Sequence, residues 1–241
     1  MNLKKICTLG LVAFGISSVA LADGFSATLD APIIPTSNFS VRLGLNYSLE
    51  VSPNLFVGAS LNPTITPSAA NVFSLNARIG AKYVILLYKD FSSLVNGYVG
   101  AGIAASVVPT PFNIGADVNA GVYGFTALGG GFKLYGGADG KLGYNFTIGA
   151  IDYAAIGYVG VFVEPLTSLE LRLQGSAGVV GIGSAGAGFF AAGSSLYYTI
   201  VPQFKVGITA NYNSNGAFVF GLGALFAEKP GTLGIAGNYL P

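Results

Sequence analysis

The sequence predicts an all-β fold: a single transmembrane, antiparallel, up-and-down β-barrel of about 12 strands, within a range of about 10 to 14. Apolar residues alternate with small or polar ones along several long segments. The chain is 52% hydrophobic and only 9% charged, with a mean hydropathy of +0.64, whereas a soluble domain averages about 25% charged. Lipid requires every backbone polar group to pair within the protein. Because no convincing apolar helix follows the first residues, closed strands are the remaining solution.

The first 22 residues have the pattern of a secretory signal peptide. A start with two lysines is followed by an apolar run to about residue 21, and Ala20 and Ala22 form a small-residue cleavage site. Removal after Ala22 would leave 23–241 as one barrel domain, and the single cysteine, Cys7, would leave with the signal. An uncleaved membrane anchor is the alternative, which the shortness of the run disfavours.

The clearest alternation runs from 39 to 51, where every odd residue is apolar and every even residue is polar or glycine. This segment is about twice as long as an ordinary strand of about 5 or 6 residues. It has the length that a tilted strand needs to cross a bilayer. The same period of two recurs at 73–85, 114–122, 142–148, 169–174 and 204–213.

Proline marks the ends of several predicted strands. At Pro53, Pro165 and Pro202 a strand ends, a tight turn follows and alternation resumes within a few residues. We expect these three turns on one rim of the barrel. The longer connections would then lie on the other rim, at 62–71, 107–112 and 213–216.

Strand directions alternate in such a barrel, so an even number of strands must separate Pro53 from Pro165. The segments between them number seven: 55–62, 73–85, 94–105, 113–125, 130–137, 142–150 and 153–163. One of these assignments is therefore wrong, and the glycine-rich stretch from Gly124 to Gly160 is where we expect the error. Further strands are predicted at 25–33, 39–51, 167–181, 187–200, 203–213 and 217–227, with 232–240 as an alternative closing strand.

The second face of these strands carries glycine, Ser, Thr, Asn and single charges, rather than the Lys and Glu of a water-exposed face. With the signal peptide, the proline turns and the supply of Tyr and Phe for interfacial girdles, the chain from about Phe25 to Phe226 resembles the bacterial outer-membrane β-barrel proteins, porin-like ones in particular. The resemblance implies a place in the outer membrane, contact with its lipid, and proline turns on the periplasmic rim. It also implies a closing strand that ends on an aromatic residue.

The composition argues against most catalytic and nucleic-acid-binding sites. The chain has no histidine and would have no cysteine after cleavage, which removes Ser-His and Cys-His sites and the usual zinc ligands. We therefore expect no enzyme and no cofactor. The net charge is +1, or −1 without Lys4 and Lys5, and no basic cluster suggests nucleic acid.

The GxGxxG match at 181–186 lacks a β-α-β context and is better explained as a glycine-rich strand end or loop. The stretch 175–193 is too rich in glycine for a spanning helix.

The inward face is expected to be lined by small residues, which would leave a lumen open. The leading hypothesis is a passive diffusion channel for small solutes. Alternatives are a closed structural or surface-binding barrel, and a barrel that passes hydrophobic substrates through apolar patches at 101–108 and 189–192. A soluble secreted β-protein is a weaker alternative, and a homo-oligomer is left open. Eight charged or polar residues are candidates for lining the lumen: Arg42, Arg78, Lys82, Asp117, Lys133, Glu170, Arg172 and Lys205. Together with Glu50 they make six positive and three negative charges, which would weakly favour the passage of anions.

Overall fold

A computed structural model describes residues 24–34, 41–66, 73–107, 112–214, 216 and 218–227. Two expectations lie outside these residues, namely the signal peptide at 1–22 and the alternative closing strand at 232–240.

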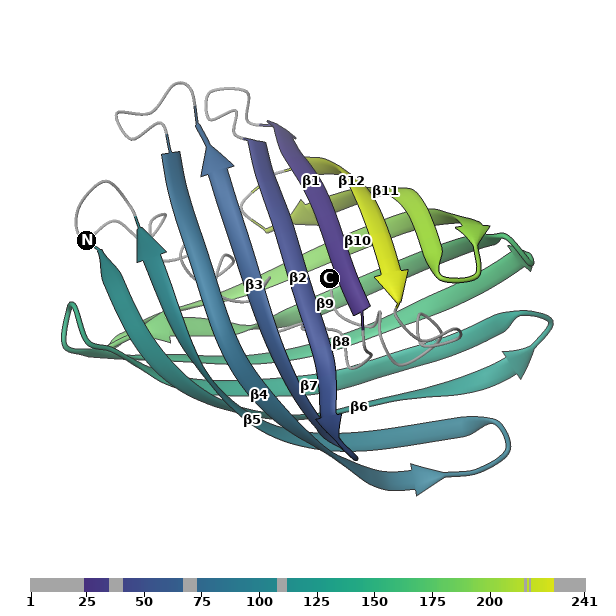
Figure 1. Ribbon diagram of the computed structural model, residues 1–241, viewed down its shortest axis with the longest axis horizontal. Helices are drawn as coiled ribbons and strands as arrows, with labels where there is room; N and C mark the ends of the chain where they lie inside the picture. Colours follow the sequence, from purple (N-terminus) through teal and green to yellow (C-terminus); the bar gives the residue numbers. More distant parts are fainter. Residues whose placement is uncertain are drawn as a thin grey trace.

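The described chain forms twelve antiparallel strands, each hydrogen-bonded to its neighbours in sequence. The first and last strands also pair, with Gly24 opposite Ala227 and Phe25 opposite Phe226, so the sheet closes into a barrel (Figure 1). The predicted fold class, strand number and closing strand 217–227 are therefore confirmed. The strands are β1 (Gly24–Ile34), β2 (Val41–Ser52), β3 (Leu55–Ile65), β4 (Phe73–Lys89), β5 (Ser93–Val107), β6 (Asn113–Gly129), β7 (Phe132–Asn145), β8 (Ala150–Leu166), β9 (Leu169–Ile182), β10 (Ala185–Val201), β11 (Phe204–Asn213) and β12 (Phe218–Ala227).

The error that strand parity required lies in the glycine-rich middle, as expected. The segments predicted at 130–137 and 142–150 are not separate strands, because β7 runs unbroken from Phe132 to Asn145 and a turn occupies 146–149. Glycine at 136 and 137 does not interrupt the strand, since both residues keep their partners on β6 and β8. Six strands, β3 to β8, therefore separate the turns next to Pro53 and Pro165.

The three proline turns share one rim, because they connect β2 to β3, β8 to β9, and β10 to β11. The longer connections expected opposite them join β3 to β4, β5 to β6, and β11 to β12, which places them on the other rim. We call these the proline rim and the loop rim. The GxGxxG segment at 181–186 is the hairpin between β9 and β10, with Gly183 at a φ of 61°, which the glycine-rich turn interpretation anticipated. Within the described residues, no helix is long and apolar enough to span a membrane.

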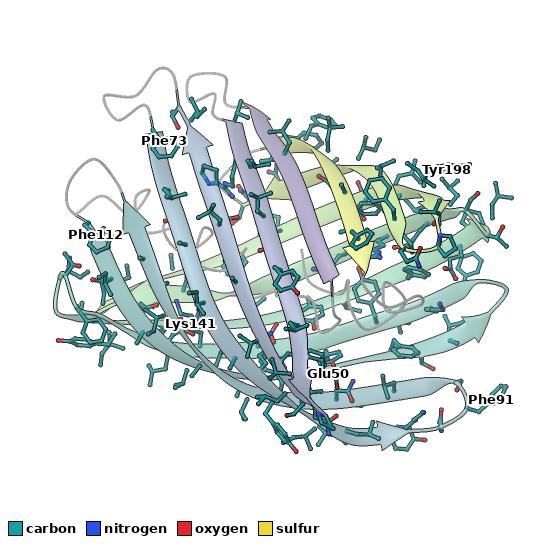
Figure 2. All side chains as sticks on the ribbon, in the orientation of Figure 1. Glu50, Phe73, Phe91, Phe112, Lys141 and Tyr198 are labelled. Atoms are coloured by element: carbon teal, nitrogen blue, oxygen red, sulfur yellow. The ribbon has the colours of Figure 1, made fainter. Side chains whose placement is uncertain are left out.

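The outer surface is an apolar belt with aromatic residues toward both rims. Ile79, Ile103 and Leu222 are 65%, 62% and 59% exposed. On β4 and β5, the strands of the first two, the opposite face buries the polar side chains of Arg78 and Asn96. In Figure 2, Phe73 and Phe112 lie at the loop-rim ends of their strands and Phe91 extends from a turn on the proline rim. An exposed apolar surface of this extent is the surface of a protein that contacts lipid, and aromatic girdles at both interfaces accompany it in membrane barrels.

Candidate functional site

The inner face of the barrel carries the polar and charged side chains, opposite the exposed apolar rows. Of the eight candidate lumen residues, Arg42 and Lys133 are half-buried on β2 and β7. The other six are at most 9% exposed and come from β4, β6, β9 and β11: Arg78, Lys82, Asp117, Glu170, Arg172 and Lys205.

One ion pair crosses over an intervening strand. Arg78 on β4 donates from Nη2 to Oδ1 of Asp117 on β6 over a distance of 2.5 Å, and Asn119 Nδ2 also donates to that oxygen at 3.3 Å. The residue beneath this pair on β5 is Gly102, where a Cβ would lie 2.7 Å from Arg78 Nη2. A glycine on β5 is therefore what allows β4 and β6 to bond across it.

A second cluster joins β9 to β11. Glu170 accepts hydrogen bonds from Arg172 and from Lys205 Nζ, the latter at 2.5 Å, and its side chain is 3% exposed. Tyr197 of β10 lies opposite Glu170 in register, and the guanidinium of Arg172 lies 5.7 Å from its ring. A buried carboxylate shared by two cations is well compensated in charge.

Four further charges lie on the inner face but were not among the eight candidates. Lys141 Nζ lies 2.6 Å from Asp152 Oδ2, and Lys133 Nζ lies 3.4 Å from Glu164 Oε2. Asp139 accepts a hydrogen bond from the hydroxyl of Tyr98. Counting Arg42 and Glu50, the described inner face has seven basic and six acidic residues: Arg42, Arg78, Lys82, Lys133, Lys141, Arg172 and Lys205, and Glu50, Asp117, Asp139, Asp152, Glu164 and Glu170. This balance removes most of the positive excess expected from the sequence.

The expectation that small residues dominate the inward face is wrong for β4 to β8. A buried cluster on the inner face of β4 to β8 contains Val84, Tyr98, Tyr123, Tyr135, Tyr158 and Phe162, and Phe56 and Phe125 pack against it. The alternating segments from which the inward face was inferred contain none of these tyrosines, so no face was assigned to them.

Each of several inward tyrosines lies opposite a glycine on a neighbouring strand. The register pairs Tyr98 with Gly121, Tyr135 with Gly160, and Tyr158 with Gly137. A Cβ at Gly137 would lie 2.5 Å from the Tyr158 hydroxyl, and one at Gly121 would lie 2.7 Å from the Tyr98 ring. The missing side chain therefore makes room for a ring that lies against the wall. Paired Tyr and Gly at complementary positions of adjacent strands is the sequence signal that could have revealed these contacts.

Cations lie over the aromatic rings of the same wall. Lys82 Nζ is 4.2 Å from the ring centroid of Tyr98, and Lys133 Nζ is 4.7 Å from that of Phe162. The guanidinium of Arg172 is 5.5 Å from the same Phe162 ring. Contacts of this kind stabilise partly desolvated cations, so the wall from β4 to β10 is both aromatic and ionic.

The apolar inward patches expected at 101–108 and 189–192 are only partly observed. Ile103 is 62% exposed on the outer face and Ala101 is exposed as well, whereas Gly102 lies under the inner ion pair, so alternation divides the first patch between the two faces. Alternation divides the second patch, since Phe190 is 53% exposed outside while Phe189 is half-buried. These segments therefore do not form an apolar lining.

Comparisons with known proteins place the fold in one class. No protein-family model matches the chain, and no curated protein matches its sequence. Among solved structures, the porin NanC has a TM-score of 0.55 at 11% identity, covering 84% of this chain and 98% of NanC. The porin KdgM, in complex with oligogalacturonate, has a TM-score of 0.52 at 10% identity, covering 86% of this chain and 99% of KdgM. The translocator domain of autotransporter NalP from Neisseria meningitidis has a TM-score of 0.52 at 11% identity, covering 92% and 95%.

The chain is therefore an outer-membrane-type β-barrel of the broad class found in bacteria. That fold is shared by porins and by an autotransporter domain, so the fold by itself does not select one function.

Proposed function

We propose that this chain is a passive, porin-like diffusion channel for small polar solutes in the bacterial outer membrane. The observation that carries the proposal is the opposition of the two faces: the outer belt is apolar, whereas the inner face carries ion pairs and polar side chains within a closed barrel of twelve strands. A barrel of this size lies between small filled barrels and wide aqueous channels. Likeness to the porins KdgM and NanC supports the same reading.

The proposal includes no chemical step. The sequence has no histidine, and most charged groups of the described inner face are engaged in ion pairs or lie over rings rather than forming a nucleophile with its base. Because basic and acidic inner residues nearly balance, we expect little discrimination between small anions and cations.

Planar-bilayer recording of refolded 23–241 tests the proposal. Discrete conductance steps are expected, with a reversal potential close to zero in a potassium chloride gradient. Absence of any step over repeated insertions would overturn the channel.

The aromatic cluster supports one alternative, a closed structural or surface-binding barrel. Tyr98, Tyr135 and Phe162 are each 3% exposed, so this part of the inner face is packed. This alternative predicts a folded, membrane-inserted barrel that never conducts, which the same recording distinguishes.

A further inference from the structure

The inner face of β2 and β3 differs from the aromatic and ionic wall. Its inward positions are small or polar from Gly44 to Ser48 and from Gly58 to Asn62, with Phe56 packed against the aromatic cluster. In register, Ser48 lies opposite Gly58, Asn46 opposite Ser60, and Arg42 opposite Thr64. The polar surface continues onto β4, where Asn76 lies opposite Asn62.

Four polar atoms on these two strands are buried without a hydrogen-bond partner. They are Arg42 Nε, Ser48 Oγ, Ser60 Oγ and Asn62 Nδ2, which we call the β2–β3 polar row. Ser48 is 1% exposed, Ser60 6% and Asn62 9%. A buried polar group left unpaired is destabilising by about 1 to 3 kcal/mol. A row of four such atoms in one region therefore points to a hydrogen-bonding occupant.

The chemistry of the row defines that occupant. All four atoms can donate a hydrogen bond, and the two serine hydroxyls can also accept one. A ligand that matches this row carries several hydroxyl groups, because a hydroxyl can both accept and donate a hydrogen bond. Three of the four groups are uncharged, two serine hydroxyls and one asparagine amide, and Arg42 supplies the single charge. A neutral ligand suits this balance better than an anion.

We propose that the β2–β3 polar row is a binding track for neutral polyhydroxylated solutes, such as simple sugars, along one side of the lumen. The inference rests on the proposed channel and names the class of solute that this channel passes. On the opposite wall, rings lie against glycines and most charges are paired. Asn119 Oδ1 and the Tyr158 hydroxyl there also lack a hydrogen-bond partner, but they lie on separate strands, β6 and β8, and form no continuous row.

Block of ion current by glucose tests the track. With the wild-type barrel in a planar bilayer, added glucose is expected to reduce the current in a saturable way. The current of the double variant Ser60→Val with Asn62→Leu is compared with its own current without sugar. Its half-block should require about tenfold more glucose, the loss expected for one to two hydrogen bonds. The matched control is Ser176→Val on the inner face of β9, which should respond as the wild type.

Several outcomes would overturn the track. One is a loss of current no larger than the viscosity of the glucose solution explains, and another is an equal response of the double variant and the wild type. Half-block by sodium gluconate at a much lower concentration than glucose would show that the row selects a carboxylate, against the neutral class.

If the barrel never conducts, the proposed channel function is overturned, but sugar binding to the polar row is not yet tested. Saturation-transfer NMR of glucose with the detergent-folded barrel decides it independently. The wild type and Ser176→Val should show transfer and the double variant should not. No transfer to a folded wild type means that the row holds water only, which overturns the inference.

Discussion

At the scale of single residues, glycine does two different things on the inner face. Gly137 and Gly160 leave space for the rings of Tyr158 and Tyr135, so that bulky side chains lie flat against the wall. Gly102 lies beneath the Arg78 to Asp117 ion pair that joins two strands across a third. The abundance of glycine, 36 in the whole chain, thus serves packing and long side-chain bridges as well as turns.

Substituting one of these glycines should destabilise the barrel. In Gly160→Ala the new Cβ would lie 2.5 Å from the carbonyl oxygen of Leu173 and against the Tyr135 ring, closer than real Cβ contacts. We expect a loss of about 1 to 3 kcal/mol in the free energy of unfolding, measured by circular dichroism in urea. Gly175→Ala on β9 is the control, because nothing lies within 4 Å of a Cβ there. Equal stability of the two variants would refute the packing role.

The buried ion pair should be more sensitive to losing one partner than to losing both. Asp117→Asn leaves Arg78, 7% exposed, without its compensating charge, and the expected loss is about 3 to 5 kcal/mol in the free energy of unfolding. Replacing both residues, Arg78→Met with Asp117→Leu, should recover part of that loss. Urea unfolding of the two variants checks this, and a double variant less stable than the single one would contradict it.

At the scale of elements, alternation was sufficient to predict most strands. The strands at 25–33, 39–51, 167–181 and 203–213 agree with β1, β2, β9 and β11 to within a few residues, because one face meets an apolar phase and the other does not. The prediction failed in the middle of the sequence. There the glycines at 136, 137 and 140 suggested the end of a strand, although β7 continues through them. Parity located that error because hairpin strands must alternate in direction.

The pairing of side chains was less predictable than the strands. The eight candidate residues were selected as polar residues between apolar ones, and that pattern carries no register. Which charges meet depends on the shear of the barrel, as with Arg78 and Asp117, which are separated by 39 positions and one strand. The tyrosines were missed because an aromatic residue fits the lipid face equally well by pattern.

The turn between β2 and β3 should depend on its asparagine. Asn54 has a φ of 68°, its N–H donates to Glu50 Oε1 at 3.3 Å, and its carbonyl accepts a hydrogen bond from Val84 N at 2.8 Å. Asn54→Val should lose about 1 to 2 kcal/mol in the free energy of unfolding, because a β-branched residue disfavours this backbone conformation. Asn54→Gly is the control and should stay close to the wild type in thermal unfolding. A wild-type melting temperature for Asn54→Val would contradict the strain.

At the scale of the whole molecule, the barrel is asymmetric around its circumference. On the inner face from β4 to β10, aromatic rings and paired charges are packed against the strands, whereas the inner face of β2 and β3 carries small and polar side chains. Outside, the apolar belt makes the barrel insoluble as a monomer in water and stable in lipid, which couples location to fold.

The most direct test of the account measures which face each residue presents after insertion into lipid vesicles. Spin labels at Ile103→Cys and Ser176→Cys suffice, because 23–241 contains no other cysteine. The account predicts that the label at position 103 collides with dissolved oxygen and is shielded from a water-soluble nickel chelate, whereas the label at position 176 shows the reverse. A label at position 103 that the nickel chelate reaches freely would contradict the claim that this face lies in hydrocarbon.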